Sequence, residues 1–465
     1  MQFLQVSGKY IVNERREKVF LRGVCFGGWL NMENFIIGYP GTESNVRRAV
    51  RDVLGEERYQ AFFESLLESF ITEGDFKFLK EKGATVVRVP FNYRHFEDDM
   101  NPGVYDKKGF RFLDRAIEFA KKHGIYVILD LHAAPGWQNQ GWHSDNPHAI
   151  SLMWTQRHYQ ERVTGLWRYI ADHYKNEPAV AGYNLLNEPN APNFDILNRL
   201  YREWVGAIRD VDKRHLIFLE GNTYSQKLDG LDDPFDDNLV YSCHNYSLPT
   251  HRATVYPGTV FGIYADAKHL EEAFLQRAQW MLDKGVPGWV GEFGALYDNG
   301  AANPSPSDLA RLKALEDQLQ IFNKYDQHWT IWTYKDVDVQ GLAVPKADSE
   351  YMCRIRPILE MKKNLGLDGW TTGSTGTLTT KISQVVDLMM VMLKDSSLDA
   401  MGLKRSLGQE AVYGTIASFL APLYALRFRD MSVDEIRQMH EEAFVFENCQ
   451  QRDYLVDALE KAFKG

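Results

Sequence analysis

Short apolar, β-rich segments alternate with longer amphipathic segments along most of this chain, and this alternation constrains the fold more than any other feature. Several of the short segments lack the polar alternation of a strand with one face in water, so we expect parallel strands that are buried on both faces. Eight strands are predicted, at Val19–Phe26, Ala84–Pro90, Ile125–Leu131, Val180–Asn187, His215–Glu220, Leu239–His244, Pro287–Glu292 and Trp329–Thr333.

Helices are predicted between these strands. Three of them are followed by Gly83, Gly124 and Gly285, as expected of helix C-caps. Eight strands alternating with helices fit a closed barrel or an open doubly wound sheet. An open sheet that binds a dinucleotide needs G-x-G-x-x-G after its first strand, and GVCFGGWL at 23–30 lacks that spacing. The pattern therefore favours an α/β fold, a (β/α)8 TIM barrel. The predicted helices are Glu56–Lys82, Gly109–His123, Trp154–Tyr174, Phe194–Val211, Leu270–Lys284 and Leu309–Asn323.

The character of the chain changes after the eighth strand. Residues 368–380 (DGWTTGSTGTLTT) predict a loop, and residues 381–465 are predicted to be wholly helical. A barrel takes roughly 250 residues, so the 465 residues accommodate one barrel and an additional region. We predict a catalytic barrel over 1–365 and a helical C-terminal extension over 366–465 that packs on the barrel.

Two segments of the extension are strongly apolar. The uncharged run Ala411–Leu426 has 16 residues, short of the ~20 residues of a membrane span, and predicts a buried helix. Val385–Leu393 (VVDLMMVML) should not remain in water, so we expect it to pack on the barrel or to form an oligomer contact. Ser432, with Glu435 three residues later, predicts a capping box.

Charge and composition exclude several classes of partner. The net charge is −10 with both signs interspersed and no basic stripe, so nucleic acid is not an expected partner. The cysteines have no metal-ligand spacing, and we expect no cofactor and no metal. Residues 1–20 contain no apolar segment typical of a secretion signal, so a cytoplasmic location is expected. The oligomeric state stays open.

Two glutamates occupy strand ends, where parallel barrels carry their reactive groups. Glu188 follows the fourth predicted strand, and Glu292 ends the seventh. Strands three apart in an eight-stranded barrel face each other across its mouth, so the two carboxyl groups can flank one bond. Glycoside hydrolysis needs one protonated and one ionised carboxyl group at such positions.

Other strand ends carry polar or aromatic residues that suit this chemistry. Arg88 could keep Glu292 ionised through its charge, and Tyr246 could donate a hydrogen bond to the same carboxylate. His244 could orient the acid, and Asn187 could bind the 2-hydroxyl group of the sugar.

The strand-end set also includes His132 and Trp332, and Trp332 could offer an apolar face to the sugar ring. The alternative reading is structural: Arg88 and His132 would be satisfied polar groups of the core, and Trp332 would pack within it.

These motifs resemble glycoside hydrolase family five, the cellulase family among the barrel glycosidases. YNLLNEP at 183–189 resembles the signature of the acid/base, and WVGEFGA at 289–295 resembles that of the nucleophile. The resemblance covers roughly residues 19–340 and implies a retaining β-glycosidase with Glu188 as general acid/base and Glu292 as nucleophile. Further matches are VVRVPF with Arg88, DLHAAPG with His132, the His-x-Tyr pair His244 and Tyr246, and IWTYKD with Trp332.

The first loop resembles that of the family's exo-β-1,3-glucanases in the segment LRGVCFGGWLNMENFI at 21–36. In those enzymes a Glu after GGWL helps to bind the terminal sugar, which implies this role for Glu33. The long loop Ala133–Ser151 could close one end of the groove, and its Trp137 is the tryptophan that we expect to bind sugar. Trp29, Trp142 and Trp289 are equally compatible with core packing. We therefore expect exo action on β-glucosides or β-gluco-oligosaccharides.

Three alternatives remain at this point. An endo-acting β-1,4-glucanase or β-mannanase would have an open cleft, with Glu33 as a structural ion-pair partner. A metal-dependent barrel hydrolase would need a His-x-His pair on strand one, where this chain has Cys25. A non-catalytic sugar-binding protein could use the same fold. His143, His148 and His158 are expected at the surface.

Overall fold

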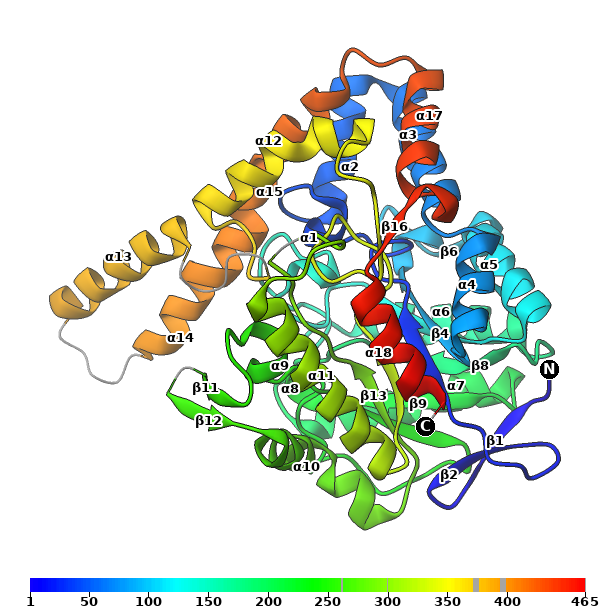
Figure 1. The fold of residues 1–465 in the computed structure, drawn as a ribbon. Helices are drawn as coiled ribbons and strands as arrows, with labels where there is room; N and C mark the ends of the chain where they lie inside the picture. The colour runs from blue at the N-terminus through cyan, green and yellow to red at the C-terminus, as the bar shows by residue number, and fades with distance from the viewer. Residues whose placement is uncertain (261, 299, 371–375, 394–398, 465) are drawn as a thin grey trace.

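Eight parallel strands pair in chain order and close into a barrel, which confirms the predicted (β/α)8 fold (Figure 1). The computed structural model describes residues 1–260, 262–298, 300–370, 376–393 and 399–464. The predicted fourth strand is three residues too long, so Asn187 and Glu188 lie in the turn after it. The strands are β3 (Arg22–Cys25), β4 (Val86–Asn92), β7 (Tyr126–Ala133), β8 (Val180–Asn184), β9 (Leu216–Glu220), β10 (Leu239–His244), β13 (Gly288–Glu292) and β14 (His328–Ile331).

Helices surround the barrel, and Gly83, Gly124 and Gly285 cap three of them with left-handed backbone, as predicted. The single helix predicted over Glu56–Lys82 is wrong, because the hydroxyl of Thr72 and the carboxylate of Asp75 form a capping box that begins a second helix. The helices that precede the extension are α1 (Asn34–Ile37), α2 (Glu43–Leu54), α3 (Glu56–Phe70), α4 (Glu73–Lys82), α5 (Phe110–His123), α6 (Arg157–Tyr174), α7 (Phe194–Val211), α8 (Asn222–Ser225), α9 (Leu248–Arg252), α10 (Ala267–Lys284) and α11 (Pro306–Lys324).

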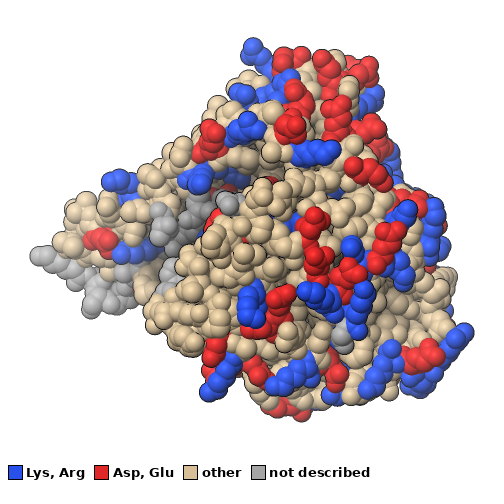
Figure 2. All heavy atoms as spheres, viewed as in Figure 1, with Lys and Arg blue, Asp and Glu red and all other residues tan. Residues whose placement is uncertain are grey.

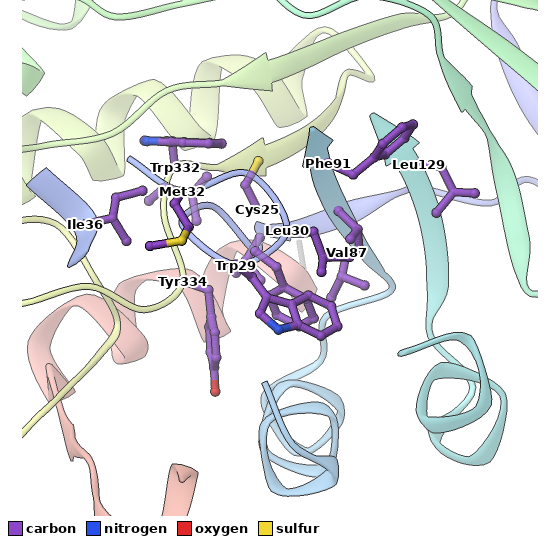
Figure 3. Packing of buried hydrophobic residues seen from close by; sticks show 14 of the residues in the cluster. Cys25, Trp29, Leu30, Met32, Ile36, Val87, Phe91, Leu129, Trp332 and Tyr334 are labelled. Carbon is purple, nitrogen blue, oxygen red and sulfur yellow. The ribbon is translucent and has the colours of Figure 1, made fainter. Parts of the chain in front are cut away.

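Apolar side chains fill the barrel below the site. The hairpin of β1 (Leu4–Ser7) and β2 (Tyr10–Asn13) closes the lower end, where Leu4 packs with Phe218 and Trp289 in one cluster. Around the first loop, a larger cluster holds Trp29, Leu30 and Trp332 (Figure 3). The mouth is therefore built on a rigid apolar base.

The C-terminal extension contributes to the ring of helices. Helix α17 (Val433–Phe444) packs on α3, and α18 (Asp453–Lys464) lies between α11 and α4. Phe463 of α18 stacks on Trp329 of β14 with the ring centroids 5.1 Å apart. The eighth outer helix of the barrel thus comes from the end of the chain. The division at residue 365 stays a prediction.

Other details of the extension differ from the prediction. The capping box of Ser432 and Glu435 is confirmed. The extension is not wholly helical, because β16 (Gln450–Gln451) pairs with β15 (Ala343–Val344). Helix α12 (Glu350–Leu365) precedes the extension. The other helical segments of the extension are α13 (Thr377–Leu393), α14 (Ala400–Arg405), η5 (Ser406–Ile416), α15 (Ala417–Phe419), α16 (Ala421–Ala425), η6 (Leu426–Phe428) and η7 (Phe446–Asn448).

The single buried helix predicted over Ala411–Leu426 is wrong. The run is divided among η5, α15 and α16, and Phe419 is 79% exposed. In the described part of the chain, no single helix is long and apolar enough to cross a membrane. One pair bent by 50°, Ala411–Phe419 with Ala421–Phe428, passes that test by length and composition only.

The apolar segment Val385–Leu393 does not pack on the barrel. Its helix, α13, meets α12, α14 and η5, all outside the barrel, and projects away from it (Figure 1). Val391 and Met392 are 70% and 72% exposed, whereas Val386 is buried. The first half of α13 is anchored on the extension, and the oligomer contact stays a prediction. Both signs of charge are scattered over the face seen in Figure 2.

A chain that ends at Leu365 should be insoluble or strongly destabilised, because it lacks the eighth barrel helix and the cover of α3. Within the intact chain, Leu459→Ala in α18 removes a fully buried side chain and should cost about 2–5 kcal/mol of unfolding free energy. Soluble yield and denaturant unfolding measure both effects.

The matched control is Met392→Ala on α13, which should change stability by less than about 0.5 kcal/mol because the side chain is exposed. A soluble, fully active chain ending at Leu365 would contradict this view of the extension.

Candidate active site

Arg88 lies at the centre of the polar groups in the barrel mouth. Strand β4 places its guanidinium in full burial, where Nη1 is 2.5 Å from Glu292 Oε1. Nη2 is 3.1 Å from Asp130 and 3.2 Å from Glu220, and it donates to Asn187 Oδ1 at 2.8 Å. Burial opposes the charge, but these carboxylates outweigh it and raise the pKa of Arg88 well above its ordinary value.

Glu292 ends β13 and accepts two hydrogen bonds, one on each oxygen. Oε1 faces Arg88, and Oε2 accepts from the Tyr246 hydroxyl at 3.0 Å. Burial and the charge of Glu292 raise the pKa of Tyr246, so the phenol keeps its proton and remains a donor. These two hydrogen bonds hold the carboxylate in one orientation.

Glu188 follows β8 in an unusual backbone conformation, with φ of 46° directly before Pro189. Its N–H donates to Glu220 Oε2 at 2.8 Å, which holds this left-handed turn. On its side chain, Oε1 lies 2.8 Å from His244 Nδ1, and Oε2 lies 3.1 Å from His143 Nε2. The turn therefore aims the carboxyl group between two imidazoles.

Burial and hydrogen bonding shift the pKa of Glu188 in opposite directions. Burial raises the pKa of Glu188, but hydrogen bonds donated by His143 and His244 lower it further than burial raises it. For His244, burial lowers the pKa, but Glu292, Glu220 and Glu188 raise it well above its ordinary value. The acidic neighbours therefore favour the protonated form of His244, whose Nδ1 contacts Glu188 and whose Nε2 lies 3.4 Å from Glu220 Oε2.

Glu188, His244 and Glu292 come close together across the mouth. One ligand atom from each lies within 4.8 Å of the others, a spacing that could also hold a metal ion. A cation there would be repelled by the guanidinium of Arg88 and by the charged ring of His244. The arrangement suits a bond between two carboxyl groups better than a metal.

A second group of residues borders the site on the side of β7 and the first loop. His132 Nδ1 is 2.7 Å from Asp130, and its Nε2 is 3.3 Å from Glu33 Oε1 and 3.3 Å from Asn187 Nδ2. Its ring stacks on Trp332 at 5.2 Å with an interplanar angle of 6°. Burial lowers the pKa of His132, but Asp130 and Glu33 outweigh it and raise it to about 9.

Nine of the ten predicted site residues are joined by these contacts, and Trp137 is the exception. Among the described residues, its ring contact is to His148, with the centroids 5.9 Å apart. Trp29 and Trp289 are buried in the core, whereas Trp142 lies against His143. Sugar binding by Trp137 stays a prediction.

Three site residues were not predicted. Glu220 ends β9 in the same way that Glu292 ends β13, and Asp130 lies two positions before His132, so the strand-end rule signals both. His143 was expected at the surface, which is wrong, because the loop folds its ring back onto Glu188. Its sequence position carries no signal for that contact.

The extension also reaches the mouth. Trp370 packs edge-on against Tyr246 and His251 at centroid distances of 5.0 and 4.6 Å. Tyr413 contacts the ring of Trp142 at 5.7 Å. Residues far apart in the sequence thus line two sides of the entrance.

Comparisons with known proteins find one family model and several similar proteins. Residues 57–338 match the family model described as cellulase, glycosyl hydrolase family 5. A protein named beta-xylosidase from Phanerodontia chrysosporium is 38% identical, covering 98% of this chain and 97% of that protein. A probable glucan 1,3-beta-glucosidase A from Emericella nidulans is 30% identical, with coverages of 70% and 87%. Endoglucanase C from Acetivibrio thermocellus is 29% identical, with coverages of 61% and 89%.

Asp130→Asn should lower the pKa of His132 from about 9, because the substitution removes the negative charge that outweighs burial. Histidine-selective NMR titration measures this value directly. Asp114→Asn on α5, whose carboxylate contacts His173, is the control and should leave the titration of His132 unchanged. An unshifted His132 in Asp130→Asn would show that another group holds its proton.

Proposed function

This chain belongs to glycosyl hydrolase family 5, the cellulase family, and is a glycosidase; we propose that it hydrolyses β-glucosides or short β-gluco-oligosaccharides with retention of configuration. The observation that carries this proposal is the facing pair of Glu188 and Glu292, with carboxylate oxygens within 4.8 Å of each other. Retaining enzymes hold their carboxyl groups about 5–5.5 Å apart, and inverting ones about 6.5–9.5 Å apart.

The two glutamates take different roles in this proposal. Glu292 is the nucleophile, because the Arg88 guanidinium and the Tyr246 hydroxyl donate to its two oxygens and orient it at the end of β13. Glu188 is the general acid/base, because its carboxyl group faces Glu292 across the mouth and contacts the imidazoles of His143 and His244, side chains of a type that takes part in proton transfer.

The reaction proceeds in two displacements. Glu188 donates its proton to the leaving oxygen while Glu292 Oε2 or Oε1 attacks the anomeric carbon, giving a covalent glycosyl-enzyme and a free alcohol. Glu188 then takes a proton from a water molecule. The oxygen of that water attacks the anomeric carbon and displaces the carboxylate of Glu292. Asn187, held by Arg88 and His132, is placed to bind the 2-hydroxyl group of the sugar.

We infer exo action from the way the entrance is bordered. Glu33 is buried beside His132 on the first-loop side, where its carboxylate can bind hydroxyl groups of a terminal sugar. The loop that carries Trp142 is buttressed by Tyr413 of the extension. A continuing sugar chain would clash with such a wall, whereas a terminal unit would fit.

The relatives favour one second candidate. The relative that matches over almost the whole length, including the extension, is named a beta-xylosidase, so a β-xyloside is the alternative substrate. Endo action on β-1,4-glucan remains the contrasting mode, since a relative covering 61% of this chain is named endoglucanase C. An aryl β-glucoside and an aryl β-xyloside, compared by kcat/KM, separate the two sugars.

The roles are tested with Glu188→Ala. This variant should lose far more rate on substrates with poor leaving groups than on those with good ones, because only the former need an acid. Added azide should restore part of the rate and yield a β-glycosyl azide, the product that retention requires. Glu292→Gln, a matched carboxyl-to-amide change, should fold normally and show no turnover with either class.

Equal loss by Glu188→Ala on every leaving group, with no response to azide, would refute the assigned roles. An α-glycosyl azide would refute retention while leaving the identity of the two residues intact.

Exo action is tested by a product time course on short β-gluco-oligosaccharides. A monosaccharide should be the sole early product, because the closed end admits one sugar unit. Glu33→Gln should lower kcat/KM by about 10- to 100-fold, the value of a lost hydrogen bond to a charged group. The control Glu57→Gln, on the exposed start of α3, should leave it unchanged.

Mixed oligosaccharides at early times, or a rapid fall in the viscosity of carboxymethyl-cellulose, would instead support the open-cleft alternative.

A further inference from the structure

The extension holds one aromatic ring at the mouth of the barrel. Trp370 is only partly buried, and its ring lies 5.0 Å from that of Tyr246 and 5.4 Å from that of Phe35. Tyr246 donates to Glu292, and Phe35 lies two positions after Glu33 in the first loop. Trp370 therefore packs between the hydrogen-bond donor to one carboxylate and the loop that carries the other.

Two cations tie this part of the extension to the mouth. Arg252, at the end of α9, donates from Nη2 to the carbonyl of Trp370 at 2.8 Å. Lys362 of α12 is buried, with Nζ 3.3 Å from Asp368 Oδ2 and donating to the carbonyl of Asn34 at 2.7 Å. A buried ammonium group is stable only with such partners. The position of Trp370 is therefore fixed from two sides, by α9 and by the first loop.

Gly369 connects Trp370 with the loop after β7. A β-carbon at position 369 would lie 3.5 Å from the ring of Trp142 and 3.1 Å from the ring of Tyr413, so the backbone of Gly369 packs against both rings. Trp142, Gly369 and Trp370 thus form one continuous aromatic border on this side of the mouth.

The aromatic border lies where the far end of a bound sugar must be. The anomeric carbon has to meet the carboxylate of Glu292, and the C3 and C4 hydroxyl groups are at the opposite end of the sugar ring. In the proposed site these hydroxyl groups bind to Glu33, on the loop whose Phe35 contacts Trp370. A second sugar linked through C3 or C4 would be pressed against the face of an indole ring, which offers its hydroxyl groups no hydrogen-bond partner.

We propose that Trp370 is the end wall of the sugar site and limits this site to one sugar unit, so that a residue of the extension sets the exo specificity of the barrel. This inference rests on the proposed function as an exo-acting glycosidase and names the residue that produces the exo action. Trp370 determines specificity by excluding a second sugar and takes no part in breaking the bond.

The test compares the first products of three substrates, 4-nitrophenyl β-cellobioside, β-laminaribioside and β-xylobioside. With the wall in place, cleavage should occur between the two sugars and give a monosaccharide and an aryl monoglycoside. In Trp370→Ala the second sugar can pass the border, so cleavage at the aryl bond should release 4-nitrophenol and the intact disaccharide. This direct release should rise by about 10- to 200-fold for at least one diglycoside, the range that a methylene group contributes to discrimination in an apolar pocket.

Aryl monoglycosides and a second tryptophan provide the controls. Trp370→Ala should lower kcat/KM for 4-nitrophenyl β-glucoside or β-xyloside by no more than about 10-fold, because a single sugar loses only its contact with one ring. Trp280→Ala on α10 also removes a partly buried tryptophan, which packs on Tyr241 at 4.9 Å, and should keep the wild-type products. Trp370→Leu retains an apolar side chain at the core and should show the same change of products as Trp370→Ala.

Unchanged products in a folded Trp370 variant would overturn the end wall and leave the proposed function intact. Direct release of the disaccharide by the wild type would do the same. If Trp370→Ala and Trp370→Leu both failed to fold while Trp280→Ala folded, Trp370 would be a structural residue and the proposal would be wrong. Failure of the wild type on both aryl monoglycosides would instead refute the proposed function, and the end wall with it, before any variant is compared.

Discussion

The ion pairs of Arg88 determine the arrangement of the mouth. A fully buried guanidinium is stable only among anions, and three carboxylates from β7, β9 and β13 converge on it. Removing one partner of such a buried group costs roughly 3–5 kcal/mol, because an unpaired charge remains in a medium of low dielectric. These carboxylates are therefore tied to one place, and each then acts on a further residue: Asp130 on His132, Glu220 on Glu188, and Glu292 on Tyr246. The geometry of the whole site therefore depends on the position of Arg88.

The barrel and the facing glutamates were predictable because both follow from one-dimensional patterns. Strands that are buried on both faces must be apolar throughout, and they must end in polar residues where the barrel opens to water. This rule gives the eight strands to within a few residues and places Glu188 and Glu292 at the mouth. The break at Thr72 was missed, although Thr72 and Asp75 form a capping-box pattern in the sequence and Gly74 lies between them. Only the pairing of Thr72 with Asp75 ends one helix and begins the next.

The parts that sequence could not provide depend on folding over long distances. His143 reaches Glu188 because a loop held by Asn31 turns back over the mouth, and nothing in the residues near His143 encodes that turn. Exposure of α13 was unpredictable for a related reason. An apolar segment predicts that its side chains will be buried. Which surface remains free to bury them depends on elements elsewhere in the chain. Here α16, α17 and α18 occupy surfaces on α2, α3, α4 and α11, and α13 meets α12, α14 and η5.

The extension links stability and specificity within one segment. The family match ends at residue 338, before α12 begins, yet the ring of barrel helices is completed only by α18. On the way to α18 the chain passes the entrance, where Trp370 packs against Tyr246, the hydrogen-bond donor to Glu292. The chain between β14 and α18 therefore both borders the mouth and supplies the last helix of the ring. The protein named beta-xylosidase matches over 98% of this chain, so the match includes the extension as well as the barrel.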